Sequence, residues 1–241
     1  KANINKIIIY SRDEQKQYQL KRFYNSKKLR FLLGDVRDKE RLDFAMQDVD
    51  IVIHAAALKH VDMAEYNPFE YIKTNIIGAE NIISCALNNK VSKVIALSTD
   101  KASSPANLYG ATKLLSDKLF VAANNWKGKK FFNTKLSVVR YGNVMGSRGS
   151  VVPLFLKQKK EKFFTVTDPS MTRFNITLKE GVEFVIFAIQ DMLGGEIFIP
   201  KLKSYTLKNL IEAISPKAKI KYIGLRPGEK KHEEMISVND S

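Results

Sequence analysis

Short runs of aliphatic residues alternate with longer amphipathic stretches along most of this chain. Runs such as Lys6–Tyr10 (KIIIY) and Lys93–Ser98 (KVIALS) are almost continuously apolar, as in strands that are buried on both faces of a parallel sheet. Similar runs occupy Arg30–Asp35, Asp50–Ala55 and Leu136–Tyr141. Strands that alternate with helices predict a parallel sheet with right-handed crossovers. We therefore expect an α/β fold with a Rossmann-like, doubly wound parallel sheet.

The amphipathic stretches between these strands are predicted helices, at Asp13–Phe23, Lys39–Met46, Pro68–Asn88 (capped by Asn67) and Asn107–Asn125. After Gly142 the alternation loosens. There we expect a loop at Gly142–Ser150, a helix from Pro153, a loop at Thr165–Asn175, a helix at Leu178–Met192, a strand at Glu196–Pro200, a helix from about Thr206 and a strand at Lys219–Ile223. The prediction is a Rossmann-like domain over residues 1–142 and a smaller, interleaved and truncated lobe over residues 143–241.

Composition excludes several classes of protein. The single cysteine, Cys85, rules out a disulfide scaffold and a cysteine-based zinc site. His54 and His60 are too isolated for a metal site, so we predict none, and read His54 as structural and Cys85 as a core residue. No apolar run is long enough to span a membrane, and no signal peptide is visible. We expect a cytosolic protein that binds neither membrane nor nucleic acid, because the basic residues behind the net charge of +15 are scattered.

Tyr109 and Lys113 have the spacing Tyr-x-x-x-Lys at the start of a predicted helix. Four residues make about one turn, so both side chains share a face. An ammonium beside a phenol favours the phenolate and lowers the pKa of the tyrosine. Tyr109 is therefore a candidate base for a hydroxyl group that is being oxidised. Taken alone, the motif also fits an ordinary exposed helix pair.

A second cluster, Ser98-Thr99-Asp100-Lys101, ends the strand before this helix. Open α/β sheets bind their ligands at the carboxyl ends of parallel strands. An acid and an amine at such a place, beside a Tyr/Lys pair, are candidates for proton transfer. The alternative is a solvated ion pair at a strand end.

The end of the first strand, Ser11-Arg12, resembles the point where dinucleotide folds contact the adenosine ribose. An arginine there accommodates a 2′-phosphate, so Arg12 and Lys16 favour NADP over NAD. No glycine-rich phosphate loop precedes this strand. If Lys6–Tyr10 is the second strand of such a fold, a βα unit of roughly 25–35 residues that carries this loop is missing.

With these motifs in hand, the chain resembles the extended short-chain dehydrogenase/reductase superfamily, and within it the UDP-N-acetylglucosamine 4,6-dehydratases. The segments that carry the resemblance are YSRDE (10–14), GDVRD (34–38), HAAALKHVD (54–62), STDKA (98–102), NLYGATK (107–113), RYGNVMGSRGSVVP (140–153), MTRF (171–174) and RPGEKKHEEM (226–235). One branch of this family inverts C5 and keeps the tyrosine, whereas the other retains C5 and has methionine in its place. Tyr109 is typical of the inverting branch, which opens the route to pseudaminic acid for flagellin glycosylation.

The resemblance implies roles for individual residues. Tyr109 would take the proton of the sugar 4-hydroxyl, Lys101 the C5 proton, and Asp100 would protonate the departing 6-hydroxyl, beside Thr99. Lys113 would hold the nicotinamide ribose. Residues implied to face NADP are Ser11, Arg12, Asp13, Glu14, Gln15, Lys16, Asp35, Val36, Ala55, Ala56, Lys59, Leu97, Ser98, Tyr109 and Lys113, with Val144, Met145, Gly146, Ser147 and Arg148 closing over the nicotinamide. Residues implied to face UDP-N-acetylglucosamine are Lys59, Asn143, Val151, Thr167, Arg173 and Arg226.

Other functions stay open at this point. The retaining dehydratase and a UDP-sugar 4-epimerase are the nearest alternatives, and a non-catalytic NADP-binding protein is a third. An epimerase needs neither a base at C5 nor an acid at C6, so Asp100 and Lys101 argue against it. Members of this family commonly assemble, and we expect a homo-oligomer. For Arg173, an ordinary salt bridge between the lobes is the alternative to substrate binding.

Overall fold

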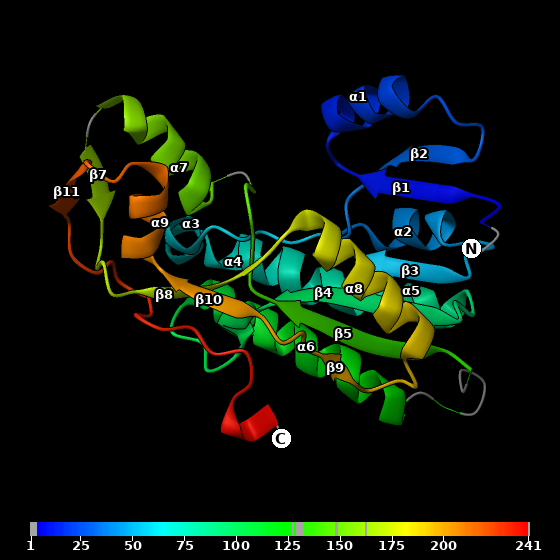
Figure 1. Ribbon diagram of the computed structural model, residues 1–241. Coiled ribbons are helices and arrows are strands. Elements are labelled where there is room, and N and C mark those ends of the chain that lie inside the picture. Colours follow the sequence, from blue (N-terminus) through cyan, green and yellow to red (C-terminus); the bar gives the residue numbers. More distant parts are fainter. Residues whose placement is uncertain (1–3, 127, 129–132, 148, 162, 241) are drawn as a thin grey trace.

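A four-stranded parallel sheet lies at the centre of the molecule in the computed structural model (Figure 1). The structure describes residues 4–126, 128, 133–147, 149–161 and 163–240. The strands of this sheet, in spatial order, are β3 (Ile51–His54), β4 (Lys93–Thr99), β5 (Lys135–Tyr141) and β9 (Ile197–Phe198). β4 and β5 pair along their whole length, from Lys93 opposite Lys135 to Thr99 opposite Tyr141.

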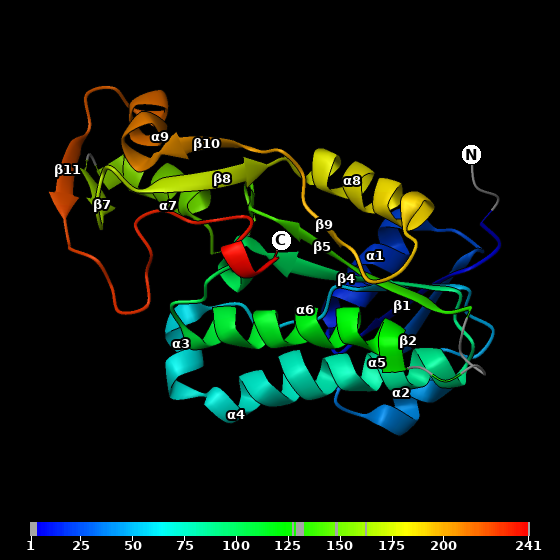
Figure 2. The same ribbon diagram turned by 90° about the horizontal axis from the view of Figure 1, so that it is seen from below.

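Helices cover this sheet on both faces, as the doubly wound prediction requires. Figure 2 shows α5 and α6 side by side on one face and α8 on the other. The helices outside the second lobe are α1 (Glu14–Tyr24), α2 (Lys39–Ala45), α3 (Val61–Tyr66), α4 (Pro68–Tyr71), α5 (Gly78–Asn88), α6 (Leu108–Trp126) and α8 (Leu178–Asp191). A π-helical stretch at Ile72–Ile77 joins α4 to α5. The predicted α/β fold class is confirmed.

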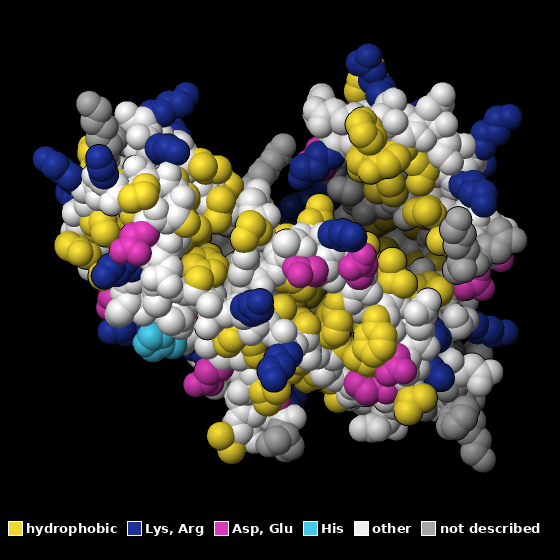
Figure 3. Space-filling view, in the orientation of Figure 1, with side chains coloured by type: hydrophobic (Ala, Val, Ile, Leu, Met, Phe, Trp, Pro, Cys, Tyr) yellow, Lys and Arg dark blue, Asp and Glu magenta, His cyan; other side chains and the backbone are white. Residues whose placement is uncertain are grey.

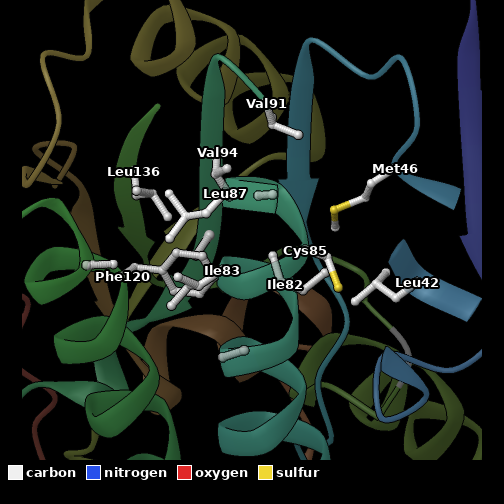
Figure 4. Packing of buried hydrophobic residues seen from close by; sticks show 14 of the residues in the cluster. Leu42, Met46, Ile82, Ile83, Cys85, Leu87, Val91, Val94, Phe120 and Leu136 are labelled. Carbon is white, nitrogen blue, oxygen red and sulfur yellow. The ribbon is translucent and has the colours of Figure 1, made fainter. Parts of the chain in front are cut away.

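The main core lies between the sheet and the layer of α5 and α6 (Figure 4). Val94 of β4, Leu136 of β5 and Phe120 of α6 are fully buried there. Each such aliphatic or aromatic side chain contributes about 1.5–3 kcal/mol by leaving water. Cys85 of α5 is also fully buried and its Sγ donates to the carbonyl of Lys39, which confirms its prediction as a core residue.

A separate parallel pair, β1 (Ile7–Ser11) and β2 (Leu29–Leu33), lies beside the main sheet with α1 against it (Figure 1). The side chain of Asp13 caps α1 by accepting a hydrogen bond from the N–H of Lys16. The arrows of β1, β4 and β5 all point toward the smaller lobe in Figure 1. The carboxyl ends of the two parallel groups therefore face the same side of the molecule.

The smaller lobe is built from two short sheets and two helices. One sheet has the order β10-β8-β6 and the other pairs β11 with β7. The bounds are β6 (Asn143–Val144), α7 (Val151–Gln158), β7 (Phe163–Val166), β8 (Thr172–Ile176), β10 (Lys203–Thr206), α9 (Leu207–Ile214) and β11 (Lys219–Tyr222). Between β8 and β10, the chain returns to the main sheet as α8 and β9. The boundary at residue 142 stays a prediction.

Several local predictions are wrong. The segment Thr165–Asn175 is not a loop, because it holds the end of β7 and most of β8. The predicted loop at Gly142–Ser150 includes the short strand β6, and α3 and β10 were not predicted. Helix α7 begins at Val151 rather than Pro153, since a proline in the first turn lacks only an N–H that has no helical partner there. The Asn67 side chain does not cap α4; its amide donates to the carbonyl of Met63.

None of the helices in the part of the chain that the structure describes is both long and apolar enough to cross a membrane.

Candidate active site

The carboxyl end of β4 holds Asp100 and Lys101 in a single 3₁₀ turn, Asp100–Ala102. The preceding residue, Thr99, begins the turn, because its Oγ1 accepts a hydrogen bond of 3.4 Å from the N–H of Lys101. The side chain of Asp100 is fully buried and that of Lys101 is 21% exposed. Both residues thus lie at the strand ends where open α/β sheets bind ligands.

Helix α6 brings Tyr109 and Lys113 to the same place. Its start is fixed by Asn107, whose Oδ1 accepts a hydrogen bond of 2.8 Å from the N–H of Gly110. Tyr109 and Lys113 lie one turn apart and both are buried. Gly110 allows the close approach of the helix to the 3₁₀ turn, because a Cβ at this position would overlap the carbonyl oxygen of Lys101.

Thr99, Asp100 and Lys101 form one chain of hydrogen bonds, and the Tyr109 phenol interacts with Thr99. Thr99 Oγ1 donates to Asp100 Oδ1 at 2.9 Å. Lys101 Nζ donates to the same oxygen at 3.1 Å. Asp100 Oδ2 is buried and has no hydrogen-bond partner among the described residues. A phenol, a carboxyl group and an amine are therefore in a position to exchange protons.

The pKa of Tyr109 is raised, chiefly because the phenol is buried. The hydrogen bond with Thr99 lowers it, whereas the charge of Asp100 raises it further. The expectation that the pKa of Tyr109 is lowered, with Lys113 as the cause, is wrong. Lys113 Nζ donates instead to the carbonyl oxygen of Leu97 at 2.8 Å.

Lys113 is itself affected by its surroundings. Burial lowers its pKa, and the charge of Asp117, one turn further along α6, opposes this shift. Burial and the charge of Lys113 together lower the pKa of His54 to about 3, so His54 is neutral. Its ring packs near that of Phe120, with 5.8 Å between the ring centroids, which agrees with a structural role.

A buried ionic network behind Lys113 was not predicted. Asp117 Oδ2 accepts hydrogen bonds from Ser98 Oγ at 2.8 Å and from the guanidinium of Arg140 at 3.2 Å. Arg140, fully buried on β5, also donates to Asp240 at 2.7 Å. The spacing of Lys113 and Asp117 would have placed the aspartate on the face of the lysine, but the sequence carries no signal for the partners from β5 and the C-terminal turn.

The residues predicted to hold the adenosine end form a second group at the end of β1. Asp35 pairs with Arg12 at 3.3 Å and with Arg37 at 2.8 Å, and Lys16 pairs with Asp13 at 2.9 Å. Burial alone would raise the pKa of Asp35, but the hydrogen bonds and charge of Arg37 lower it. Glu14 and Gln15 are exposed in the first turn of α1.

The remaining predicted cofactor residues differ in exposure. Ala55, Ala56 and Lys59 are exposed after the end of β3, whereas Ser98 of β4 is buried and Leu97 partly buried. Val36 lies in the main core, so only its backbone could face a ligand. Val144, the last residue of β6, and Ser147 are partly buried, whereas Met145 and Gly146 are exposed. Arg148 lies outside the described residues.

The residues predicted to bind substrate lie mainly in the smaller lobe. Arg173 donates to the carbonyl oxygens of Lys230 and Lys231 at 3.0 and 3.1 Å, so it anchors backbone rather than forming the alternative salt bridge. Arg226 pairs with Glu229 at 2.8 Å. The hydroxyl of Thr167 contacts the sulfur of Met171, and Asn143 and Val151 are partly buried.

Figure 3 shows a notch in the surface between the smaller lobe and the unit of α1, β1 and β2. The hydrogen bonds above join Thr99, Asp100 and Lys101, with Tyr109 beside Thr99. The residues around Asp35 form a separate group. A surface hollow of about 680 Å³ beside α8 is lined by residues such as Phe184, Phe187 and Leu202. None of the catalytic, cofactor-binding or substrate-binding residues predicted from the sequence lines this hollow.

The chain is similar in sequence to proteins that are named as enzymes of UDP-sugars. The chain is 60% identical over 239 residues to the "UDP-N-acetylglucosamine 4,6-dehydratase (inverting)" of Campylobacter jejuni (strain 81-176), a match that covers 98% of this chain and 71% of that protein. It is 47% identical to the "UDP-glucose 4-epimerase" of Rickettsia felis, over 98% and 70% of the two chains.

A solved structure shows the same fold. The dTDP-glucose 4,6-dehydratase DesIV of Streptomyces venezuelae, with NAD and TYD bound, superposes with a TM-score of 0.85 at 20% identity, over 97% of this chain and 79% of the other. The resemblance found in the sequence is therefore confirmed, and the chain is related to enzymes that modify nucleotide sugars. The model of the family "Polysaccharide biosynthesis protein" matches residues 1–241. This chain belongs to that family.

Proposed function

We propose that this protein catalyses the 4,6-dehydration of UDP-N-acetylglucosamine with inversion at C5, using NADP. The product is a UDP-4-keto-6-deoxy sugar, the first intermediate on the route to pseudaminic acid. The observation that carries this proposal is the hydrogen-bond chain of Thr99, Asp100 and Lys101 at the end of β4, with the Tyr109 phenol beside Thr99. It supplies both a base and an acid next to a Tyr/Lys pair.

The described residues fit a nicotinamide dinucleotide at its two ends. Small exposed residues after β3, Ala55 and Ala56, leave room for a flat ring against the backbone. Lys113 of α6, whose Nζ donates to the carbonyl of Leu97 on β4, would supply a donor for a ribose hydroxyl. At the end of β1, Arg12 and Lys16 supply positive charge for a 2′-phosphate. When bound, the cofactor would supply the hydride chemistry of the reaction, the oxidation at C4 and the later reduction at C6.

The protein groups perform the proton transfers. Tyr109 removes the proton of the 4-hydroxyl during oxidation at C4. The resulting ketone acidifies the C5 proton, which Lys101 removes as a neutral amine. Asp100, in its protonated form, gives a proton to the 6-hydroxyl, which leaves as water. Delivery of a proton to the opposite face of C5 then gives the inverted sugar. The other lobe, with Arg226 near the UDP group, holds the substrate, because a guanidinium suits a diphosphate.

The experiment that tests this function follows the sugar itself. The protein in its natural full-length form is incubated with UDP-N-acetylglucosamine and NADP⁺ in D₂O, and the product is analysed by mass spectrometry and NMR. Loss of one water, with deuterium and inverted configuration at C5, is the expected result. Loss of water with retained C5 would place the enzyme in the retaining branch, and no conversion would reject the substrate. A parallel titration with NAD⁺ tests the preference for NADP.

A 4-epimerase is the second candidate, favoured by relatives with that name such as the protein of Rickettsia felis. Its product has the same mass as its substrate, so mass spectrometry separates the two activities directly. The variant Lys101→Ala separates them again. A dehydratase loses turnover by about 100-fold or more when a general base is removed, but an epimerase does not need this amine. A non-catalytic binding protein would be indifferent to the change.

A further inference from the structure

A segment from the far end of the chain lies against the candidate active site. This segment, residues 226–240, is called the return segment below, because it leads back from the smaller lobe to the end of β4 (Figures 1 and 2). Three hydrogen bonds join this segment to residues 103–107, after the end of β4: Asn107 Nδ2 donates to the carbonyl of Gly228 (2.8 Å), Lys230 Nζ to the carbonyl of Ser103 (2.8 Å) and Ser104 Oγ to Glu234 Oε2 (3.1 Å). A fourth joins it to β8, where the N–H of Thr172 donates to the carbonyl of Lys231 at 3.1 Å.

One side chain of this segment, Glu233, points into the site. It is 4% exposed, and its Oε1 lies 3.5 Å from Lys101 Nζ. Asp100 Oδ1 accepts from the same nitrogen at 3.1 Å. Glu233 Oε2 and Asp100 Oδ2 are both buried and have no hydrogen-bond partner among the described residues. Lys101 therefore lies between two buried carboxyl groups.

Both carboxyl groups are buried beside one amine, so either can stabilise a positive charge on it. In the proposed reaction, Lys101 becomes an ammonium when it takes the C5 proton, while Asp100 gives its proton to the leaving group. Glu233 Oε1, 3.5 Å away, then serves as a counter-ion for the new ammonium. The other ionisable groups nearby are Tyr109, linked through Thr99, and Lys230, whose amine is bound to the carbonyl of Ser103.

We propose that Glu233 is a positioning residue for elimination at C5 and C6, which fixes the Lys101 amine and serves as the counter-ion of the ammonium that forms when Lys101 takes the C5 proton. This inference rests on the proposed function and deepens it. Glu233 acts through Lys101 rather than on the sugar. It therefore matters for removal of the C5 proton and not for oxidation at C4, which depends on Tyr109.

The test compares Glu233→Gln with Glu234→Gln in the full-length enzyme. Both variants remove one carboxylate from the same segment, but Glu234 is exposed and binds only the Ser104 hydroxyl among the contacts described above. We expect Glu233→Gln to lower turnover by about 100-fold, with reduced nicotinamide still formed in a single turnover and exchange of the C5 proton with D₂O lost. Glu234→Gln should behave as the parent enzyme.

The pH profile gives a second readout that a structural role would not change. Without the negative charge of Glu233, its neighbours lose protons more easily, so the pH–rate profile of Glu233→Gln should move by about one unit toward lower pH. Glu233→Asp keeps the charge and should keep the parent profile, even with reduced turnover. It also serves if Glu233→Gln does not fold.

The outcomes separate the two proposals. If the parent enzyme does not eliminate water from the sugar, the proposed function is wrong whatever Glu233 does. If the parent enzyme eliminates water and the Glu233→Gln profile coincides with that of Glu234→Gln, the inference about Glu233 is overturned. It is also overturned if C4 oxidation and C5 exchange fall in proportion, since that would indicate a general loss of structure.

Discussion

Two pairs of parallel strands in this molecule are similarly apolar in sequence but very different in burial. All the residues of β5 from Leu136 to Arg140 are buried, and most of β4 is as well. None of the residues of β1 or β2, all of which the structure describes, is buried. An apolar run thus indicates a strand, but it does not indicate whether one face of that strand is covered or two.

The difference follows from what packs against each pair. β4 and β5 lie between α6 and α8, whereas α1 covers β1 and β2 and has Gln17 as its buried residue. The Gln17 amide donates to the carbonyls of Ser11 and Leu32, so α1 is fastened by polar contacts rather than by an apolar interface. Parallel sheets are normally covered on both faces. We therefore expect the β1–β2 unit to tolerate change and the β4–β5 pair to resist it.

The largest difference is expected for arginines. Arg140→Ala on β5 should cost about 3–5 kcal/mol of unfolding free energy, because it removes the buried guanidinium that pairs with both Asp117 and Asp240. Arg30→Ala on β2 should change it by less than about 0.5 kcal/mol, since Arg30 is exposed and donates to the carbonyls of Lys27 and Leu29. Urea unfolding of both variants measures the contrast, and equal losses would refute it.

A smaller difference is expected for isoleucines. Ile95 of β4 is fully buried, and Ile95→Ala should cost about 2–5 kcal/mol through lost burial and a cavity. Ile8 of β1 is only partly buried, so Ile8→Ala should cost about 1 kcal/mol, in proportion to the smaller area removed from water. Thermal unfolding and amide hydrogen exchange report both values. If β1 amides exchange as slowly as those of β4, the comparison fails.

The smallest effects concern acid stability. Burial opposes ionisation of Asp240, but hydrogen bonds from Arg140 and Ser237 outweigh it and lower the pKa from 3.8 to about 2. A carboxyl group with a lowered pKa stabilises the fold above its unfolded pKa, and this contribution, about 2 kcal/mol, disappears as the pH falls from about 4 to 2. Asp240→Asn should therefore flatten the pH dependence of stability in that window.

Asp35, beside β1 and β2, is the aspartate to compare with Asp240. Its pKa is also lowered, but its ion pairs with Arg12 and Arg37 are partly exposed. Such pairs contribute little and are screened by salt. Asp35→Asn should change acid stability less than Asp240→Asn does, and added salt should remove the effect of Asp35→Asn first. A larger, salt-independent effect at Asp35 would contradict the view that this region is held mainly at its surface.

Local patterns in the sequence were sufficient for most of the main sheet. Runs such as KVIALS and the Tyr-x-x-x-Lys spacing place their residues within one strand and one helical turn, where periodicity determines direction. The strand β8 was not predicted, because TRFNI mixes polar with apolar residues at positions that are mostly only partly buried. The strand β7 (FFTV) was not predicted either, because it is only four residues long.

Contacts between distant segments could not be predicted in the same way. Glu233 meets Lys101 because the return segment crosses the molecule, and Arg140 meets Asp240 for the same reason. Neither glutamate nor arginine stands out in its local sequence. The prediction that Lys113 lowers the pKa of Tyr109 was wrong for a related reason. It depended on the direction of the Lys113 side chain, whose Nζ donates to the carbonyl of Leu97.

The missing side chain of Gly110 has a consequence for how this site could be altered. Position 110 contributes no group to the proposed chemistry, yet even one methyl group there would collide with the carbonyl of Lys101. If random variants are selected for activity, we therefore expect glycine to be retained at position 110 as consistently as Tyr109 and Lys101 are retained. The close packing of α6 against the turn that holds Lys101 depends on the absence of a Cβ atom at position 110.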